Sequence, residues 1–372
     1  MSMPIGSVAT VFQGRRVLVT GHTGFKGSWL ALWLTRLGAE VTGLSLDPPT
    51  EPSNFGASRV AEVLSRDVRG DIRDAPRVAA VVSEAEPDIV FHLAAQPIVT
   101  AGLKNPRETI EVNVVGTASV LDAVRATRRP CAVVVVTSDK CYRNTGEMWG
   151  LRESDPLGGN DPYSASKAGT ELVVDAYRAS FFPLHNISEH GVRIATVRAG
   201  NVIGGGDWAN DRILPDAARA LSAGRDLVVR NPASVRPWQH VLEALSGYLA
   251  IGAELLGSGM TEHWSGAWNF GPLLGDESTV GELATAFVDA WGSGRWVSAP
   301  SGQRSVEAVQ LRIAIDKCVR VLGWVPRWRA KEAVARTARW YRRFYDDPDA
   351  SMYGACAEDI EAYERAVHPA GE

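Results

Sequence analysis

A tyrosine and a lysine at helical spacing are the residues of this sequence best suited to acid–base chemistry. Tyr163 and Lys167 are four positions apart, so on a helix their side chains lie on one face. An ammonium group beside a phenol favours the phenolate and brings a pKa of about 10 towards neutrality. Such a phenol can remove a proton from a substrate hydroxyl while hydride leaves the carbon beneath it. The pair is common by chance, so it gains weight only from the rest of the chain.

A polar segment follows the stretch of the chain that most strongly favours a strand, residues 132–138. Thr137, Asp139 and Lys140 stand at its end, upstream of Tyr163. Parallel α/β sheets bind ligands at the carboxyl ends of their strands. These side chains are therefore candidates for catalysis. For an isolated strand end, a solvated loop that begins with a cap is an equally good interpretation.

The elements that must position these residues begin with a glycine-rich turn. Residues 16–20 predict a buried parallel strand and residues 28–39 predict a helix. Between them lies GHTGFKG, residues 21–27. Strand, glycine turn and helix start together form a dinucleotide-binding unit, because the glycines let the backbone approach a pyrophosphate at the helix N-terminus.

A carboxylate stands 20 residues beyond Gly27, where the next predicted strand, residues 40–46, ends. This residue, Asp47, can accept hydrogen bonds from an adenosine ribose and would repel a 2′-phosphate, which favours NAD over NADP. An aspartate before two prolines can instead start a turn. The flanking pattern favours the ribose role.

Strands and helices continue to alternate. Residues 87–95 predict a strand, whose end at Ala94 and Ala95 is small enough for a cofactor to lie against the backbone. Asp71 and Ile72 are placed to meet an adenine edge, with a helix N-cap as the equally weighted alternative. The repeated alternation predicts an α/β fold of the Rossmann type, a doubly wound parallel sheet with a smaller, interleaved C-terminal lobe.

The chain changes character after a further predicted strand at residues 193–197. Residues 198–208 are rich in glycine and predict a binding loop, and Arg236 beyond it could offer a bidentate donor to a diphosphate. A surface arginine is the alternative. We expect a dinucleotide-binding domain at 12–203 to which 236–272 return, a ligand-binding lobe at 204–235 and 273–350, and a tail at 351–372.

Composition narrows the function classes. The 372 residues are 45% hydrophobic and 22% charged, as in ordinary globular proteins. A net charge of −4 does not favour nucleic-acid or membrane-surface binding, although an anionic small molecule needs only a local cluster of donors. The four cysteines show no metal-like spacing, and the chain has neither a signal-peptide core nor a membrane-spanning run. We expect reduced thiols, no metal and a cytoplasmic protein.

The twelve tryptophans fall into two groups. Trp324, Trp328 and Trp340 lie in an amphipathic region and predict core or subunit contacts. Trp149 and Trp208 lie in loops near the candidate site and could form its walls.

With these residues identified, the chain resembles the extended short-chain dehydrogenase/reductase family, and within it the nucleotide-sugar 4,6-dehydratases, especially those that act on CDP-glucose. The Asp139–Lys140 pair is the most telling feature, because dehydratases that act on dTDP-glucose usually carry Asp-Glu there. The segments that carry the resemblance are GHTGFKGSW (21–29), HLAAQP (92–97), TSDKCY (137–142), GGNDPYSASK (158–167), VRAGNVIGGGDWANDR (197–212) and SVRPWQHVLE (234–243).

The resemblance implies NAD as cofactor and a redox-neutral loss of water. Tyr163, assisted by Lys167 and hydrogen-bonded through Thr137, would remove the C4 hydroxyl proton of a nucleotide sugar as hydride passes to NAD. Asp139 would protonate the departing C6 hydroxyl, and Lys140 would help to remove the C5 proton or hold the enolate. Hydride then returns to C6. A lysine can act as base only if burial or a like charge lowers its pKa.

The resemblance also assigns binding residues. Those for the cofactor are Gly21, His22, Thr23, Gly24, Phe25, Lys26, Gly27, Asp47, Asp71, Ile72, Leu93, Ala94, Ala95, Gln96, Asn113, Tyr163 and Lys167. Those for the nucleotide sugar are Gln96, Asn201, Asp207, Trp208, Arg212, Arg236 and Glu307. The family generally forms homodimers or homotetramers.

One departure from the family pattern lies beside Glu307. The family carries a His-Tyr pair where this chain has Val309-Gln310. This difference bears on the identity of the nucleotide sugar and leaves the catalytic set intact.

Two alternatives remain to be weighed. A 4-epimerase of the same family would share the NAD site and the Tyr163–Lys167 pair, but it would not need an acid–base pair such as Asp139–Lys140. A non-catalytic dinucleotide sensor could lose Tyr163 or Lys167, and both are present. The dehydratase interpretation is therefore preferred.

Overall fold

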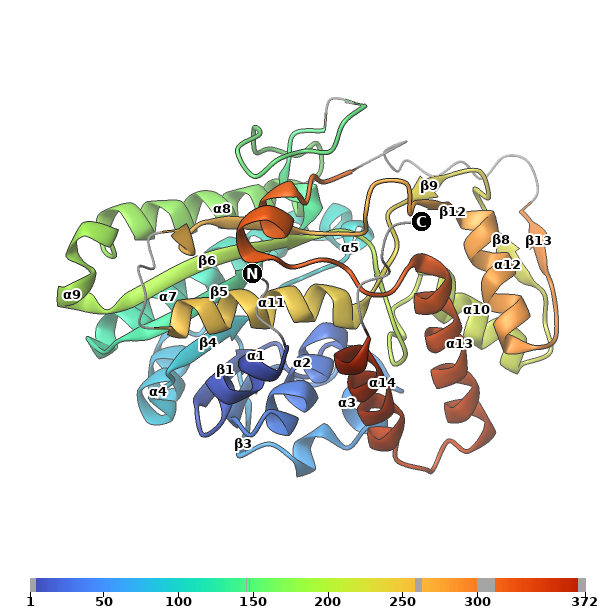
Figure 1. Ribbon diagram of the computed structural model, residues 1–372, viewed down its shortest axis with the longest axis horizontal. Helices are drawn as coiled ribbons and strands as arrows, with labels where there is room; N and C mark the ends of the chain where they lie inside the picture. Colours follow the sequence, from blue (N-terminus) through green and yellow to red (C-terminus); the bar gives the residue numbers. More distant parts are fainter. Residues whose placement is uncertain (1–4, 145, 147, 258–262, 300–311, 367–372) are drawn as a thin grey trace.

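A seven-stranded parallel sheet lies at the centre of the computed structural model, which describes residues 5–144, 146, 148–257, 263–299 and 312–366 (Figure 1). The strand order is β11-β6-β5-β4-β1-β2-β3, and each neighbouring pair is parallel. The predicted α/β class with a doubly wound parallel sheet is confirmed. The strands are β1 (Arg16–Thr20), β2 (Glu40–Ser45), β3 (Arg66–Arg69), β4 (Ile89–His92), β5 (Cys131–Val136), β6 (Val192–Ala199) and β11 (Ala267–Phe270).

Helices cover both faces of this sheet, and its strands are therefore buried on both sides. In β5, Val133 and Val135 pack into one hydrophobic cluster, whereas Val134 between them packs into another. The first cluster includes residues of α4 (Ala75–Ala85), α7 (Gly116–Thr127) and α8 (Pro162–Ser180). The second includes residues of α1 (Ile5–Phe12), α2 (Phe25–Arg36) and α11 (Val241–Leu256).

Short helical segments connect the longer elements. Proline begins α6 at a position where a missing N–H costs nothing, and a π-helical turn leads from α6 into α7. These segments are α3 (Asn54–Ala57), η1 (Val60–Glu62), α5 (Val99–Lys104), α6 (Pro106–Ile110), η2 (Glu111–Val115), η3 (Asp139–Cys141), η4 (Leu184–Asn186) and α9 (Ile187–His190).

The C-terminal lobe combines helices with two-stranded pairs. Its strands are β7 (Val202–Ile203) with β10 (Gln239–His240), β8 (Leu227–Val229) with β13 (Trp296–Ser298), and β9 (Val235–Arg236) with β12 (Ser278–Thr279). Its helical segments are α10 (Ile213–Ser222), α12 (Val280–Trp291), η6 (Cys318–Leu322) and α13 (Ala330–Asp346). In Figure 1 most of this lobe, including α10, α12 and α13, lies to the right of the sheet, whereas η6 packs beside β11.

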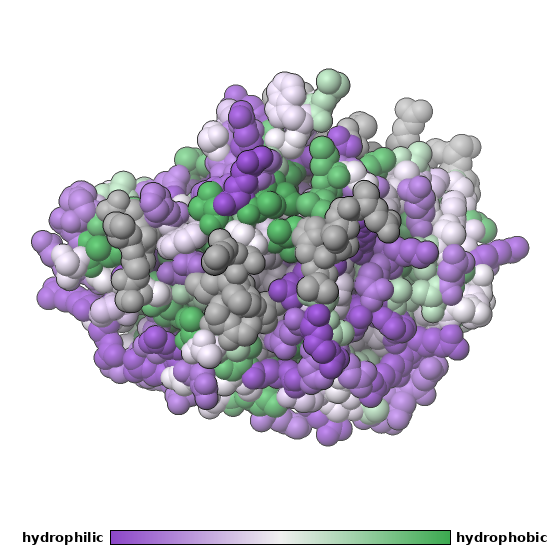
Figure 2. All heavy atoms as spheres, viewed as in Figure 1, coloured by the Kyte–Doolittle hydropathy of each residue, from purple (hydrophilic) through white to green (hydrophobic). Residues whose placement is uncertain are grey.

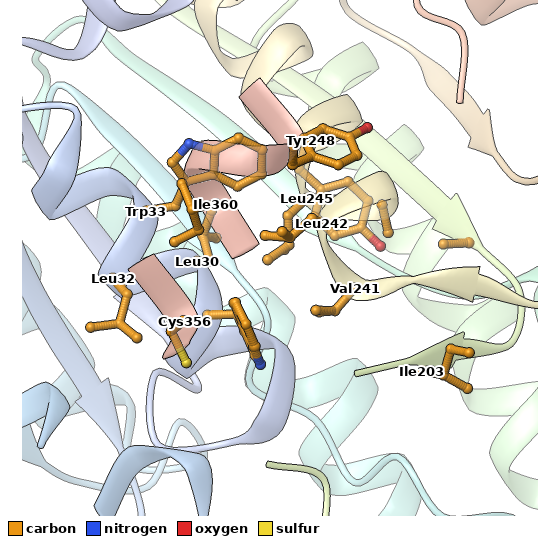
Figure 3. Packing of buried hydrophobic residues seen from close by; sticks show 14 of the residues in the cluster. Leu30, Leu32, Trp33, Ile203, Val241, Leu242, Leu245, Tyr248, Cys356 and Ile360 are labelled. Atoms are coloured by element: carbon orange, nitrogen blue, oxygen red, sulfur yellow. The ribbon is translucent and has the colours of Figure 1, made fainter. Parts of the chain in front are cut away.

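The expectation of a polar tail from residue 351 onwards is wrong for the described part of that segment. Residues Tyr353–Arg365 form α14, which packs against α2. Figure 3 shows Ile360 of α14 beside Leu30 and Trp33 of α2, with Cys356 farther along α14. The Tyr363 hydroxyl also donates to Glu243 Oε2 of α11 over 2.7 Å.

Within the described ranges, no helix has both the length and the apolar composition of a membrane span. The face shown in Figure 2 is largely hydrophilic, and its apolar residues gather towards the upper middle of the view.

Candidate active site

The glycine-rich turn between β1 and α2 is shaped by two close backbone approaches. Gly21 has a φ of +78°, and a Cβ there would lie 2.6 Å from the backbone nitrogen of Ala94. A Cβ at Gly27 would lie 2.0 Å from the Gly21 carbonyl oxygen. Gly24 caps α2 without a side-chain hydrogen bond, so no side chain of the cap competes for the first N–H groups of the helix. The turn therefore offers a backbone cradle for an anionic group at a helix N-terminus.

Two side chains of the turn anchor it to the neighbouring strands. The Thr23 hydroxyl bonds to Ser45 Oγ over 2.7 Å and donates to the Leu46 carbonyl oxygen. The buried His22 ring contacts Asp67 Oδ1 through Nε2 over 2.8 Å. The cofactor contacts expected of these two side chains remain predictions.

The adenosine end of the expected cofactor site lies beyond β2 and β3. The Asp47 carboxylate is 90% exposed and forms an ion pair with Arg69 Nε over 3.2 Å. Asp71 accepts from Arg73 Nε over 2.9 Å, while a different residue, Asp74, caps α4. The structure therefore excludes the helix-cap alternative for Asp71. Its neighbour Ile72 is buried.

The segment after β4 is clamped by Asn113. The Asn113 side chain accepts from the Gln96 backbone N–H over 2.8 Å and donates to Ser166 Oγ of α8 over 2.8 Å. The Leu93 N–H donates to the Thr20 carbonyl oxygen, and Ala94 lies against Gly21. The Gln96 side chain donates to Thr109 Oγ1 of α6 and accepts from the Ile98 N–H. Ligand contacts of Gln96, Ala95 and Asn113 remain predictions.

The catalytic end of the site brings α8 and the segment after β5 together. Asp161 caps α8 by accepting from the Ser164 N–H over 3.0 Å, which places Tyr163 in the first turn. The buried Tyr163 phenol lies near Ser138, whose hydroxyl lowers the pKa of the phenol by hydrogen bonding. Ser138 Oγ in turn donates to Asp139 Oδ1 over 2.9 Å. Phenol, hydroxyl and carboxyl thus form one connected chain.

The expectation that Thr137 hydrogen-bonds Tyr163 is wrong. The Thr137 hydroxyl donates to Glu171 Oε1 over 2.5 Å, and its neighbour Ser138 meets the phenol instead. Successive side chains of an extended segment point to opposite sides, so only one of the two can face Tyr163. Ser138 therefore replaces Thr137 in the candidate catalytic set.

Burial sets the charge states of these groups. Burial raises the pKa of Tyr163 to about 12, so the lowered phenol pKa that we expected is not found. Burial also raises the pKa of Asp139, against the opposing charges of Lys140 and Lys26. Burial lowers the pKa of Lys167 to about 8, and its Nζ donates to the Val136 carbonyl oxygen. A carboxyl with a raised pKa is suited to general-acid chemistry.

Lys26 lies at the catalytic end of the glycine turn. Its ammonium is 5.9 Å from the centre of the Tyr248 ring. Burial lowers its pKa to about 8; Arg212 and Lys167 act in the same direction, while Asp139 opposes them. The turn expected to bind the cofactor therefore also places a cation near the acid–base residues.

The residues expected to bind the nucleotide sugar differ in their surroundings, and only Arg212 has a charge that acts on Tyr163 among those described in this paragraph. Arg212 Nη1 pairs with Asp207 Oδ2 over 2.7 Å, and its charge acts on the pKa of Tyr163. Arg236 Nη1 donates to the Val235 carbonyl oxygen, and the Asn201 carbonyl oxygen accepts from the Gln239 N–H. Glu307, Val309 and Gln310 lie outside the described residues.

Trp208 belongs to the core of the lobe. Its ring lies 4.8 Å from that of Phe344 and 5.5 Å from that of Trp340, centre to centre, and the side chain is buried. We assign it a packing role in place of the expected substrate contact, because aromatic rings of α13 enclose it. Trp149, by contrast, is 59% exposed.

Three site residues were missed by sequence reasoning: Ser138, Glu171 and Arg198. Glu171 follows Lys167 by four positions on α8 and is buried, as is Arg198 in β6. A helix position in line with Tyr163 and Lys167, and a charge inside an apolar strand, were the available signals.

The sequence matches a known protein family along most of its length. The profile of the family described as GDP-mannose 4,6 dehydratase matches residues 18–337. The chain belongs to this family. It is 46% identical to the CDP-glucose 4,6-dehydratase of Salmonella typhimurium over 338 residues, which are 91% of this chain and 93% of that protein. The predicted membership among extended short-chain dehydrogenase/reductase dehydratases is confirmed.

Solved structures agree with the family assignment. One of them is DesIV, a dTDP-glucose 4,6-dehydratase from Streptomyces venezuelae that was solved with NAD and TYD bound. Its sequence is 27% identical to this chain and its TM-score is 0.70; the match covers 89% of this chain and 99% of DesIV. The epimerase Mth375 from Methanothermobacter thermautotrophicus has a TM-score of 0.76 at 24% identity, covering 92% of this chain and 98% of its own. At that identity the second likeness shows the fold alone.

Proposed function

We propose that the protein is an NAD-dependent nucleotide-sugar 4,6-dehydratase that converts CDP-D-glucose to CDP-4-dehydro-6-deoxy-D-glucose and water. The observation that carries the proposal is the hydrogen-bonded chain from Tyr163 through Ser138 to Asp139. It supports a base for the C4 hydroxyl and an acid for a leaving hydroxyl in one site. The relative that supports CDP-glucose as substrate is the Salmonella typhimurium enzyme, at 46% identity.

The glycine turn fits the proposed cofactor. Gly21 and Gly27 leave no room for a Cβ, and α2 begins at the turn with its N-terminus available to a pyrophosphate. Asp47 would hold the ribose hydroxyls at the other end of the site. When bound, NAD supplies hydride chemistry, accepting hydride from C4 of the sugar and returning it at C6. The structure of DesIV with NAD supports this cofactor.

The chain's own residues move the protons. Tyr163, in its phenolate form, takes the C4 hydroxyl proton; the Arg212 charge and the Ser138 hydroxyl favour that form against burial. The 4-keto group acidifies the C5–H bond, so Lys140 can help to remove that proton or hold the enolate. Asp139 donates a proton to the departing C6 hydroxyl, for which its raised pKa is suited. Lys167 donates to the Val136 carbonyl oxygen and lies one helical turn from Tyr163.

A test of substrate and reaction uses four nucleotide sugars. The purified protein and NAD are incubated with one nucleotide sugar at a time: CDP-glucose, dTDP-glucose, UDP-glucose or GDP-mannose. The mass of each product is measured by mass spectrometry. We expect loss of one water from CDP-glucose alone. A sugar with an unchanged mass but an inverted C4, detected by NMR, would instead indicate a 4-epimerase. No product from any of the four would overturn the proposal for CDP-glucose.

We further propose a homo-oligomer, a homodimer or homotetramer, formed through the helices between β4 and β5 together with α8. These helices pack on one another and carry large apolar side chains that are about half exposed or more: Leu103, Ile110, Val115 and Leu172. A second copy of the chain would cover this surface. Sedimentation of the wild type and of Leu172→Lys would test this; a monomeric wild type would overturn it.

The four cysteines support a cytoplasmic location. Cys131, Cys141, Cys318 and Cys356 are all free and buried. Unpaired thiols are typical of a reducing compartment.

We also propose that the product, a 4-keto-6-deoxy sugar nucleotide, serves deoxysugar synthesis.

A further inference from the structure

A buried ion pair lies directly behind the catalytic groups. Glu171 and Arg198 have side chains that are 1% and 3% exposed. Arg198 Nε donates to Glu171 Oε1 over 2.8 Å, and Arg198 Nη2 donates to Oε2 over 2.9 Å. This fork-to-fork geometry fixes the orientation of both side chains.

The carboxylate of this pair holds the segment that precedes the acid–base residues. Glu171 Oε1 also accepts from the Thr137 hydroxyl over 2.5 Å. The Thr137 N–H donates to the Val197 carbonyl oxygen over 2.9 Å, so Thr137 is tied by both its backbone and its side chain. The residue immediately after it is Ser138, the partner of Tyr163.

The guanidinium of the pair holds the segment that follows. Arg198 Nη1 donates to the Tyr142 hydroxyl over 2.7 Å and lies over the Tyr142 ring at 4.8 Å. Tyr142 donates in turn to Asn269 Oδ1 over 2.7 Å. The short helix η3 that carries Asp139 and Lys140 ends just before Tyr142.

Glu171 of this pair lies one helical turn beyond Lys167 on α8. Tyr163, Lys167 and Glu171 recur every four residues of α8 and share one face of it. All three are buried. In a buried setting a carboxylate favours the charged form of a nearby lysine, and Glu171 acts on Lys167 in this direction.

We propose that the Glu171–Arg198 pair is a positioning unit for the reaction, clamping Ser138, Asp139 and Lys140 from both ends through Thr137 and Tyr142. This inference rests on the proposed dehydratase function. Glu171 and Arg198 do not touch the reacting atoms. They act through the residues that do, because each end of the catalytic segment is hydrogen-bonded to one member of the pair.

The chain provides a matched control for this clamp. Thr196, in β6, also donates its hydroxyl to Glu171, to Oε2 over 2.7 Å. Thr137→Val and Thr196→Val therefore each remove one buried hydroxyl from the same carboxylate. Only Thr137 adjoins the catalytic segment. Tyr142→Phe releases the other end of the segment and leaves the ion pair intact.

The test measures turnover of CDP-glucose, KM and thermal unfolding for the three variants. We expect Thr137→Val and Tyr142→Phe to lower kcat about tenfold to a hundredfold with little change in KM, because small misplacements of catalytic groups are costly. Thr196→Val should keep kcat within about twofold while losing a similar amount of thermal stability to Thr137→Val. Thr137→Ser, which keeps the hydroxyl, should restore most of kcat.

Three outcomes would overturn the proposal. Equal kcat for Thr137→Val and Thr196→Val would reduce the pair to a structural role, as would unchanged kcat in both Thr137→Val and Tyr142→Phe. Failure of Thr137→Ser to restore kcat would show that the hydroxyl is not the link. A wild-type protein that does not dehydrate CDP-glucose is a separate result, which contradicts the proposed function and is obtained before any variant is made.

Discussion

The Tyr163 phenol and the Asp139 carboxyl share one hydrogen-bonding partner, the hydroxyl of Ser138. The proposed base and the proposed acid are therefore not independent groups. A single side chain between them links the group proposed to remove the C4 proton to the group proposed to protonate the C6 hydroxyl.

Ser138→Ala should impair both proton transfers. The variant leaves the phenol and the carboxyl without their shared partner, and we expect kcat to fall about a hundredfold, the usual effect of losing one aligned donor at a reacting site. Steady-state kinetics with CDP-glucose would measure it. Ser138→Thr keeps a hydroxyl and should retain much of the rate; if it is as slow as the alanine variant, the hydroxyl has no such role.

Tyr163→Phe should abolish turnover while cofactor binding survives. The substitution removes the only proton acceptor assigned to the C4 hydroxyl and costs about 10²- to 10⁴-fold in rate. The phenylalanine ring keeps the packing of α8, so NAD should titrate as in the wild type. Product formation at the wild-type rate would remove Tyr163 from the mechanism.

Asp139→Asn should separate oxidation from elimination. An amide cannot donate the proton that the leaving C6 hydroxyl needs, whereas Tyr163 remains able to act at C4. With CDP-glucose we expect absorbance of the reduced nicotinamide to accumulate on the protein without loss of water. Normal dehydration by this variant would place the acid elsewhere, and Asp139→Glu serves as the control that keeps a carboxyl.

Glu171→Gln should shift the alkaline limb of the pH–rate profile. Burial lowers the pKa of Lys167 to about 8, and Glu171 opposes that effect. Removing the carboxylate charge lowers the lysine pKa further, so activity should be lost at a pH about one unit lower. Arg198 is left without its counter-charge, which costs about 3–5 kcal/mol of stability. The profile is therefore recorded well below the melting temperature; an unshifted limb would contradict the assignment.

Glu243 should make stability depend on pH. Burial raises its pKa to about 7 from the ordinary 4.5, so between these values the folded state binds the extra proton. Stability contributed by this group is present at low pH and is lost as pH rises through about 7. Melting temperatures of the wild type and of Glu243→Gln, compared from about pH 5 to about pH 8, should differ in slope. Parallel curves would show that Glu243 does not titrate in this range.

The sequence predicts what depends on local order along the chain. The turn around Gly21 and the Tyr163–Lys167 face of α8 are encoded within a few residues, and both occur as expected. The choice between Thr137 and Ser138 as partner of the phenol is not local. It depends on how the end of β5 is turned relative to a helix that begins some 25 residues later, which no spacing along the chain specifies.

The C-terminal helix could have been predicted. Its N-cap Met352 and its residues Cys356, Ile360 and Tyr363 are fully buried and recur at intervals of four, four and three, the period of an amphipathic helix. The polar residues between them obscured this pattern. The partners of these side chains are another matter, because residues more than 300 positions away in α2 supply part of the covering surface.

The docking of α14 on α2 joins the last described helix to the first βα unit of the chain. Trp33 Nε1 donates to Glu364 Oε1 over 2.8 Å, and the rings of Trp33 and Tyr363 meet at 5.7 Å. During synthesis, the part of α2 that α14 covers therefore stays exposed until residue 365 has left the ribosome. One of the first helices to be made thus gains its full set of contacts among the last, and its apolar face is exposed to aggregation over that interval.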